Sequence, residues 1–105
     1  MILTDNNGNS VPVIEWIVEI KKSNYDLFGT VITDTLGNGL DYYKDMPIRI
    51  VRYDAWSNLL PDTYINWDDV TVNDNSMSFV LPTGHSFAIT YYTTYDEAIN
   101  GNSVN

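Results

Sequence analysis

Residues 87–95 read Phe-Ala-Ile-Thr-Tyr-Tyr-Thr-Thr-Tyr, a run made almost entirely of β-branched and aromatic residues. These residue types suit a pleated, half-buried surface, so the run predicts a strand. Working outward from it, apolar and polar residues alternate in the same way in residues 13–20, 27–34, 48–53, 70–73 and 77–81. Such alternation is typical of strands with one buried face. Short strands separated by frequent turn signals predict an all-β sandwich.

Composition limits what this sandwich can do. The chain has 105 residues, which predicts a single domain over residues 1–105. Its 14 Asp and Glu against 5 Lys and Arg give a net charge of −9, which disfavours nucleic acid and anionic membrane surfaces as partners. Cysteine is absent and His85 is the single histidine, which excludes thiolate and multi-histidine metal sites and disfavours a Ser-His hydrolase. No metal and no cofactor are expected. No apolar run approaches the roughly 20 residues of a membrane-spanning helix.

Asp34 is the first candidate for chemistry. In an extended strand it shares a face with Ile32, which places a carboxyl group at the edge of the core. A carboxyl group in such a position could shuttle protons at neutral pH. The alternative is that Asp34 accepts backbone hydrogen bonds in the turn at residues 35–37.

Three blocks carry a family resemblance: Trp16-Ile17-Val18-Glu19-Ile20, then residues 29–42 (GTVITDTLGNGLDY), then residues 87–94 (FAITYYTT). In this order they resemble the collagen-adhesin type of immunoglobulin-like domain, found in cell-wall-anchored surface proteins of Gram-positive bacteria. The resemblance implies an immunoglobulin-like β-sandwich, in one interpretation without one or both terminal strands. It also implies an adhesive or stalk module at the extracellular cell surface, with a host extracellular-matrix protein or a neighbouring adhesin domain as partner.

Many members of that family carry an isopeptide bond between a first-strand Lys and a last-strand Asn, and an Asp in the TDTL segment shuttles the protons. By position Asp34 matches that Asp. The resemblance would place the Lys near residues 2–4, which are Ile, Leu and Thr, and no lysine precedes Lys21. Lys21 is therefore a weak candidate donor and Asn105, the last residue, a weak candidate acceptor. Lys22 and Lys44 are expected to be solvent-exposed and are weaker candidate donors.

Two interpretations of the missing reactants follow. The chain could be a family module without the bond. Because Met1 directly precedes domain-like sequence, the chain is expected to be an excised or recombinant piece. Alternatively, its terminal strands could be absent so that a peptide bearing Lys or Asn adds a strand and is ligated in trans. Enzymatic activity would then amount to autocatalytic or split isopeptide formation and no more.

A third hypothesis is a carbohydrate-binding module. Its aromatic platform would consist of Tyr42, Tyr43, Tyr53, Tyr64, Trp56 and Trp67. The alternative is that these side chains fill the core, as aromatic residues of a sandwich more often do. Among the remaining acidic segments, residues 5–10 lack the acid spacing of a calcium loop and predict an ordinary turn. Asp68 and Asp69 are expected in a surface turn, because neighbouring strand residues point to opposite faces.

Overall fold

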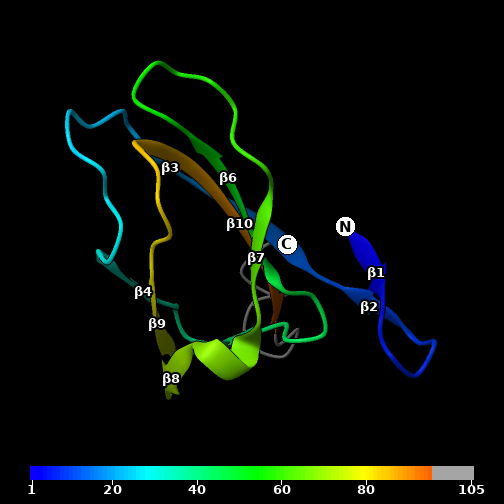
Figure 1. Ribbon diagram of the computed structural model, residues 1–105. Coiled ribbons are helices and arrows are strands. Elements are labelled where there is room, and N and C mark those ends of the chain that lie inside the picture. Colours follow the sequence, from blue (N-terminus) through cyan, green and yellow to red (C-terminus); the bar gives the residue numbers. More distant parts are fainter. Residues whose placement is uncertain (96–105) are drawn as a thin grey trace.

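The computed structural model describes residues 1–95, which are built from strands and one short 3-10 helix (Figure 1). In chain order the elements are β1 (Ile2–Thr4), β2 (Ser10–Pro12), β3 (Ile14–Ile20), β4 (Val31–Thr35), β5 (Leu40–Tyr42), β6 (Ile48–Tyr53), β7 (Thr63–Ile65), the 3-10 helix η1 (Trp67–Asp69), β8 (Thr71–Asn73), β9 (Ser76–Val80) and β10 (Ser86–Tyr95). The predicted all-β class is confirmed. Within this part of the chain, no helix has the length and hydropathy needed to cross a membrane.

The larger sheet is organised around β10, its longest strand. β10 pairs antiparallel with β3 on one side and with β6 on the other, and β7 continues the sheet beyond β6. The end of β10 pairs with β5 where β6 no longer reaches, so Thr93 lies between Tyr42 and Ile14. The strand predicted at residues 87–95 is therefore confirmed, and it is the centre of the sheet.

The smaller sheet has the order β4–β9–β8. Its pairing is antiparallel throughout, with Ile32 opposite Phe79 and Asp34 opposite Met77. A tight turn between β8 and β9 holds Asp74 at a φ of 52°, a left-handed conformation that Asp tolerates better than most residues. β4 is an edge strand of this sheet, which is important for the site described below.

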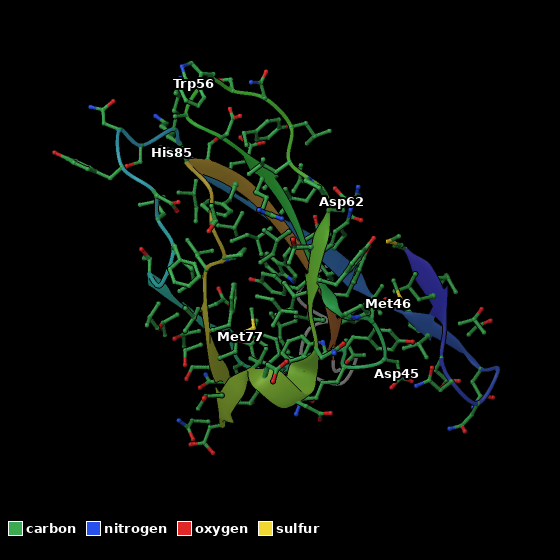
Figure 2. The ribbon with its side chains drawn as sticks, viewed as in Figure 1. Asp45, Met46, Trp56, Asp62, Met77 and His85 are labelled. Atoms are coloured by element: carbon green, nitrogen blue, oxygen red, sulfur yellow. The ribbon has the colours of Figure 1, made fainter. Side chains whose placement is uncertain are left out.

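The two sheets share one hydrophobic core, an arrangement consistent with a β-sandwich. Ile48, Ile50 and Ile89 contribute from the larger sheet, while Met77 and Phe79 contribute from the smaller, and none is more than 3% exposed. Met77 lies in the space between the sheets (Figure 2). Burying a side chain of this size stabilises the fold by about 1.5–3 kcal/mol.

The strand predicted over residues 27–34 is shorter in the structure, because β4 begins only at Val31. Asp26 Oδ1 accepts hydrogen bonds from the backbone N–H of Phe28 (2.9 Å) and of Gly84 (3.1 Å). Gly29 follows with a φ of 85°, in the left-handed region that favours glycine. These contacts form a turn where alternation had suggested a strand.

An N-terminal hairpin of β1 and β2 lies beside the main body and was not predicted (Figure 1). Its strands have three residues each and pair Leu3 with Val11. Such short strands carry too little alternation to be recognised from sequence.

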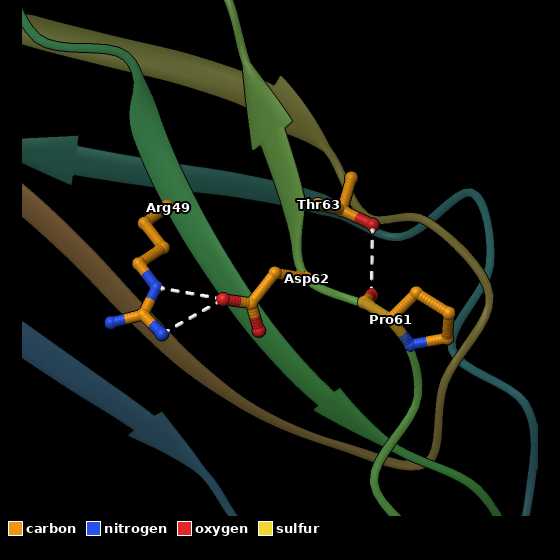
Figure 3. Close-up of polar contacts among 4 residues, drawn as sticks. All are labelled: Arg49, Pro61, Asp62 and Thr63. Carbon is orange, nitrogen blue, oxygen red and sulfur yellow. Dashed lines mark hydrogen bonds and ion pairs between the residues drawn. The ribbon is translucent and has the colours of Figure 1, made fainter.

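A surface ion pair links β6 to the residue that precedes the edge strand β7. The Arg49 guanidinium donates to Asp62 Oδ2 at 2.8 and 3.2 Å, and Thr63 Oγ1 donates to the Pro61 carbonyl at 3.5 Å (Figure 3). The Arg49 and Asp62 side chains are 51% and 37% exposed, so solvent screening limits what the pair adds to stability.

Candidate functional site

Asp34 lies on β4 with its side chain toward the other sheet. Ile32 and Asp34 are half-buried, whereas Val31, Thr33 and Thr35 on the opposite face are exposed. The prediction that Asp34 shares the inner face with Ile32 is therefore confirmed. The carboxylate lies at the end of the core, on an edge strand.

The Tyr42 hydroxyl lies against this carboxylate. Its oxygen is 3.1 Å from Asp34 Oδ2, 3.2 Å from the Asp34 carbonyl oxygen and 3.5 Å from the Asn75 carbonyl oxygen. The single phenolic proton can be donated to one acceptor at a time, and the charged carboxylate is the strongest of the three. Since Tyr42 is on β5, which pairs with β10, the contact joins the two sheets.

Tyr91, on β10, is the second phenol at this site. It is 3% exposed, and its ring centroid lies 6.2 Å from that of Tyr42. Burial, then the negative charge of Asp34, then a hydrogen bond to its carboxylate raise the pKa of Tyr91. The same causes in the same order raise the pKa of Tyr42. The site is thus one carboxylate held between two neutral tyrosine hydroxyls.

A second polar contact lies one step further along the larger sheet. Trp16 Nε1 donates to Thr93 Oγ1 at 2.9 Å, and Thr93 is fully buried. Trp16 also pairs with Tyr91 across β3 and β10. On the other side of Tyr42, the Trp67 ring packs at a centroid distance of 5.3 Å. Trp67 and Tyr91 therefore pack on the Tyr42 ring that makes the Asp34 contact, while Asp34 itself stays half-buried.

Sequence analysis did not identify Tyr42 or Tyr91 as partners of Asp34, or Thr93 as the partner of Trp16. Tyr42 and Tyr43 are only 9% and 6% exposed, so they follow the core alternative and not the surface platform of the carbohydrate-binding hypothesis. Tyr42 ends the short apolar-polar-apolar triplet of β5, and this alternation was the one signal that could have placed it in the core.

The structure does not bring the candidate amine to Asp34. Lys21 is exposed and follows Trp16 by five positions, which is about 17 Å along an extended strand. Trp16 is the residue of β3 that pairs with Tyr91, so Lys21 lies well beyond the level of Asp34. Lys22 and Lys44 are exposed as well. Asn105, the candidate acceptor, lies outside the described residues.

The six aromatic residues proposed as a sugar platform do not form one surface. Besides the buried pair, Tyr53 is half-buried and Trp67 is partly buried, with its Nε1 donating to the Met46 carbonyl at 2.7 Å. Trp56 and Tyr64 are exposed, and Trp56 lies at the far end of the molecule from Met46 (Figure 2).

The two other candidates from the sequence lie where they were expected. Asp68 and Asp69 are exposed residues of η1, as predicted for a surface turn. His85 precedes β10, and its Nδ1 lies 3.0 Å from the Ser23 carbonyl oxygen. This backbone contact fixes the ring in a loop and supplies no catalytic partner.

Among residues 1–95, each of the two sheets has an edge strand with one unpaired side, β4 in the smaller sheet and β3 in the larger. β4 pairs only with β9, and β3 pairs only with β10, within the part of the chain that the structure describes. Val18 points to the inner face of β3, as Trp16 does, yet it is 39% exposed. An inner-face residue so accessible to solvent shows that the sandwich is incompletely covered at this side.

Comparison of the chain with models of protein families, with curated proteins and with solved structures finds no match.

Proposed function

We propose that this chain is an immunoglobulin-like β-sandwich module of a bacterial surface adhesin, which serves adhesion or mechanical display and turns over no small molecule. The observation that supports this most is the contact of Asp34 with Tyr42 and Tyr91. The three sequence blocks that resemble the collagen-adhesin family supply β3, β4 with β5, and β10, and these elements meet around that contact.

In such a module the Asp34 contact would act as a link between the sheets. Many members of the resembled family join their terminal strands covalently; in this chain a hydrogen bond from Tyr42 joins β5 to β4. A hydrogen bond to a charged group contributes about 1.5–3 kcal/mol. The module would thus resist separation of its sheets by hydrogen bonding and core packing. Its partner would be a host extracellular-matrix protein or a neighbouring adhesin domain.

A direct test is to label intact cells of the source organism with an antiserum raised against the chain. Labelling of intact cells, reduced by surface proteolysis, is expected. Labelling that appears only after lysis would contradict the proposal. Binding of the purified chain to immobilised matrix proteins then identifies the partner class.

The second candidate function is isopeptide ligation in trans, which the open β3 and β4 edges favour. A peptide strand bearing a Lys or an Asn would lie beside Asp34, and its counterpart would come from a second strand. The neutral Lys amine attacks the Asn side-chain carbonyl carbon, forming the new C–N bond. Asp34 accepts the proton released by the amine and donates it to the departing NH2 group, so ammonia leaves and Asp34 returns to its starting state.

Intact mass separates these possibilities. The chain is measured alone and after mixing with peptides that span the first and last strands of the resembled family, together with Asp34→Asn and the exposed control Asp41→Asn. An adduct short of one ammonia, lost only in Asp34→Asn, would establish ligation. A free chain already short of one ammonia would show an internal bond. Unchanged masses in every mixture would leave the non-covalent module.

Carbohydrate binding has no observation in its favour beyond the exposed Trp56 and Tyr64. Sugar binding that survives Asp34→Asn but is lost in Trp56→Ala would be required to revive it.

A further inference from the structure

A hollow lies on the outer face of the larger sheet, where β3 ends and β10 begins (Figure 1). Its volume is about 260 Å³, and it is open to solvent. The hydrophobic core lies on the other face of this sheet, so the hollow is separate from the Asp34 contact. Its lining residues are Glu19, Ile20, Lys21, Lys22, Tyr53, Ser86, Phe87 and Ala88.

The central strand β10 supplies the floor of the hollow. Ser86 and Ala88 alternate along β10 with the buried Phe87 and Ile89. Because side chains of a strand point to opposite faces in turn, Ser86 and Ala88 face outward. Both side chains are short, so the outer face of the sheet is low at this place.

The two strands beside β10 supply longer side chains on the same face. Register pairs Ala88 with Glu19 of β3, and Ser86 with Tyr53 of β6. Lys21 is the next outward position after Glu19 and therefore lies beside Ser86. The short floor is thus bounded by charged side chains on one side and by an aromatic ring on the other.

Positive charge gathers at the hollow although the chain is acidic. The chain has 5 Lys and Arg against 14 Asp and Glu, and Lys21 and Lys22 are two of those five. Both lysines are exposed, and within residues 1–95 the ion pair is that of Arg49 with Asp62, so neither lysine is paired. Two unpaired ammonium groups beside hydroxyl donors suit the binding of an anion.

We propose that this hollow binds a carboxylate side chain from an acidic peptide segment of a partner protein. Lys21 and Lys22 would supply the positive charge, and the hydroxyls of Ser86 and Tyr53 would donate hydrogen bonds to the carboxylate oxygens. The Tyr53 ring and Ala88 would contact the methylene groups that carry the carboxylate. This site is independent of the proposed adhesive function.

The charges of the lining favour a carboxylate over a phosphate. Glu19 lines the hollow together with Lys21 and Lys22, so the positive charges exceed the negative by one. This excess matches a monoanion. A phosphate dianion would bring a further negative charge close to Glu19, and repulsion between the two would weaken its binding.

The surroundings of the hollow favour a peptide over a free carboxylate ion. Tyr53 is followed by a turn in which Asp54 Oδ1 accepts the backbone N–H of Trp56 at 2.9 Å. The turn leaves Trp56 81% exposed, and Figure 2 shows this residue at the same end of the molecule as His85, which precedes Ser86. Tryptophan is a frequent anchor in protein interfaces. Peptide residues on either side of the bound carboxylate would therefore find further surface to contact.

NMR titration of the ¹⁵N-labelled whole chain, at neutral pH and constant ionic strength, tests the proposal. The probes are the peptides acetyl-Gly-Glu-Gly-amide and acetyl-Gly-Gln-Gly-amide, sodium acetate and sodium phosphate. Saturable shifts of the Tyr53, Ser86 and Ala88 amides are expected with the Glu peptide, with half-saturation at about 1–10 mM. The Gln peptide, acetate and phosphate should each bind at least about threefold more weakly.

Three results of this titration would overturn the proposal. The first is the absence of saturable shifts with the Glu peptide, and the second is an equal response to the Gln peptide. The third is binding of acetate or phosphate as tight as that of the Glu peptide, which would show a general anion site and not a peptide site.

Lysine variants then locate the charge. Lys21→Gln and Lys22→Gln should each weaken binding of the Glu peptide roughly three- to fivefold, the range of an exposed charge pair. Lys44→Gln is the matched control, because it changes net charge equally and Lys44 does not line the hollow. Its affinity should stay within about twofold of wild type. An equal loss in Lys44→Gln would assign the effect to net charge and overturn the site.

Filling the hollow gives a second readout at unchanged charge. Ala88→Leu raises the floor and should weaken binding about tenfold or more, because the carboxylate could no longer enter. Thr90→Leu, at the next outward position of β10, is the control and should stay within about twofold. The spectra of both variants without peptide report whether the fold is kept. Undiminished binding in a folded Ala88→Leu chain would show that the peptide does not occupy the hollow.

Discussion

At the scale of single residues, the centre of the molecule depends on two phenols that stay neutral. Tyr42 and Tyr91 lie against the Asp34 carboxylate in the core, and burial is the first cause that raises the pKa of each above the ordinary value of 10.0. Removal of either phenolic proton would place a second negative charge beside Asp34. The contact therefore stabilises the fold only while both tyrosines are protonated.

The chain should accordingly lose stability at alkaline pH. Because the pKa of Tyr42 and of Tyr91 is higher in the folded state, their contribution is complete below pH about 10 and is lost as pH rises above it. At neutral pH, Tyr42→Phe should lower the free energy of unfolding by about 1.5–3 kcal/mol, since a hydrogen bond to a carboxylate is lost. Above pH about 10 the difference from wild type should narrow.

Urea unfolding of both proteins across the pH range measures these changes. Tyr64→Phe is the control, because Tyr64 is 56% exposed and should tolerate the change within about 0.5 kcal/mol. A Tyr42→Phe chain as stable as wild type would show that the Asp34 contact adds nothing to the fold.

At the scale of elements, the connection between β9 and β10 is packed as closely as the core. A Cβ at Gly84 would lie 2.8 Å from Cζ and 3.0 Å from Cε1 of Phe87, whose ring is 3% exposed. Phe87 opens the central strand, and Gly84 also donates its N–H to Asp26. A side chain at this position would force the buried Phe87 ring or the loop to shift, so glycine is favoured here for space.

Gly84→Ala should therefore destabilise the chain by about 1–3 kcal/mol through overpacking. Gly37→Ala is the matched control, because nothing lies within 4 Å of a Cβ at that position. Thermal unfolding of the two variants compares them directly. Equal melting temperatures would mean that the Phe87 ring can shift without cost.

At the scale of the whole molecule, net charge opposes self-association of the chain, whereas an exposed strand edge favours it. The chain carries a charge of −9, which opposes association at neutral pH. In the part of the chain that the structure describes, the edge strand β3 exposes Ile17 (58%) and Val18 (39%) and has no strand paired on its outer side. Edges of this kind pair with other chains unless charge prevents it.

Self-association should therefore increase as the pH falls toward the isoelectric point of about 4.1. Ile17→Lys places a charge on the outer face of the edge strand and should reduce that association without loss of stability. Light scattering across the pH range checks this, with Phe28→Lys as the control, because Phe28 is 71% exposed, lies outside β3 and gives the same change of one charge. Equal suppression by both variants would assign the effect to charge and not to the β3 edge.

The core pattern of β3, β6 and β10 could be read from the sequence, because alternation along one strand reports which side chains are buried. The inward direction of Asp34 followed from the same local rule, since Ile32 precedes it by two positions. The predicted start of β4 is wrong, because the hydrogen bond from the Phe28 N–H to Asp26 Oδ1 forms a turn in residues whose alternation predicts a strand.

By itself the sequence determined an acidic, all-β chain with an inward-facing Asp34. Only the tertiary structure decided that Tyr42 and Tyr91 hold this carboxylate, that Lys21 lies far along β3, and that Asp45 reaches the hairpin turn. The physical reason is the range of the interactions. Alternation is a property of neighbouring residues, whereas the partners of a buried polar group are set by which strands pair across the sheets.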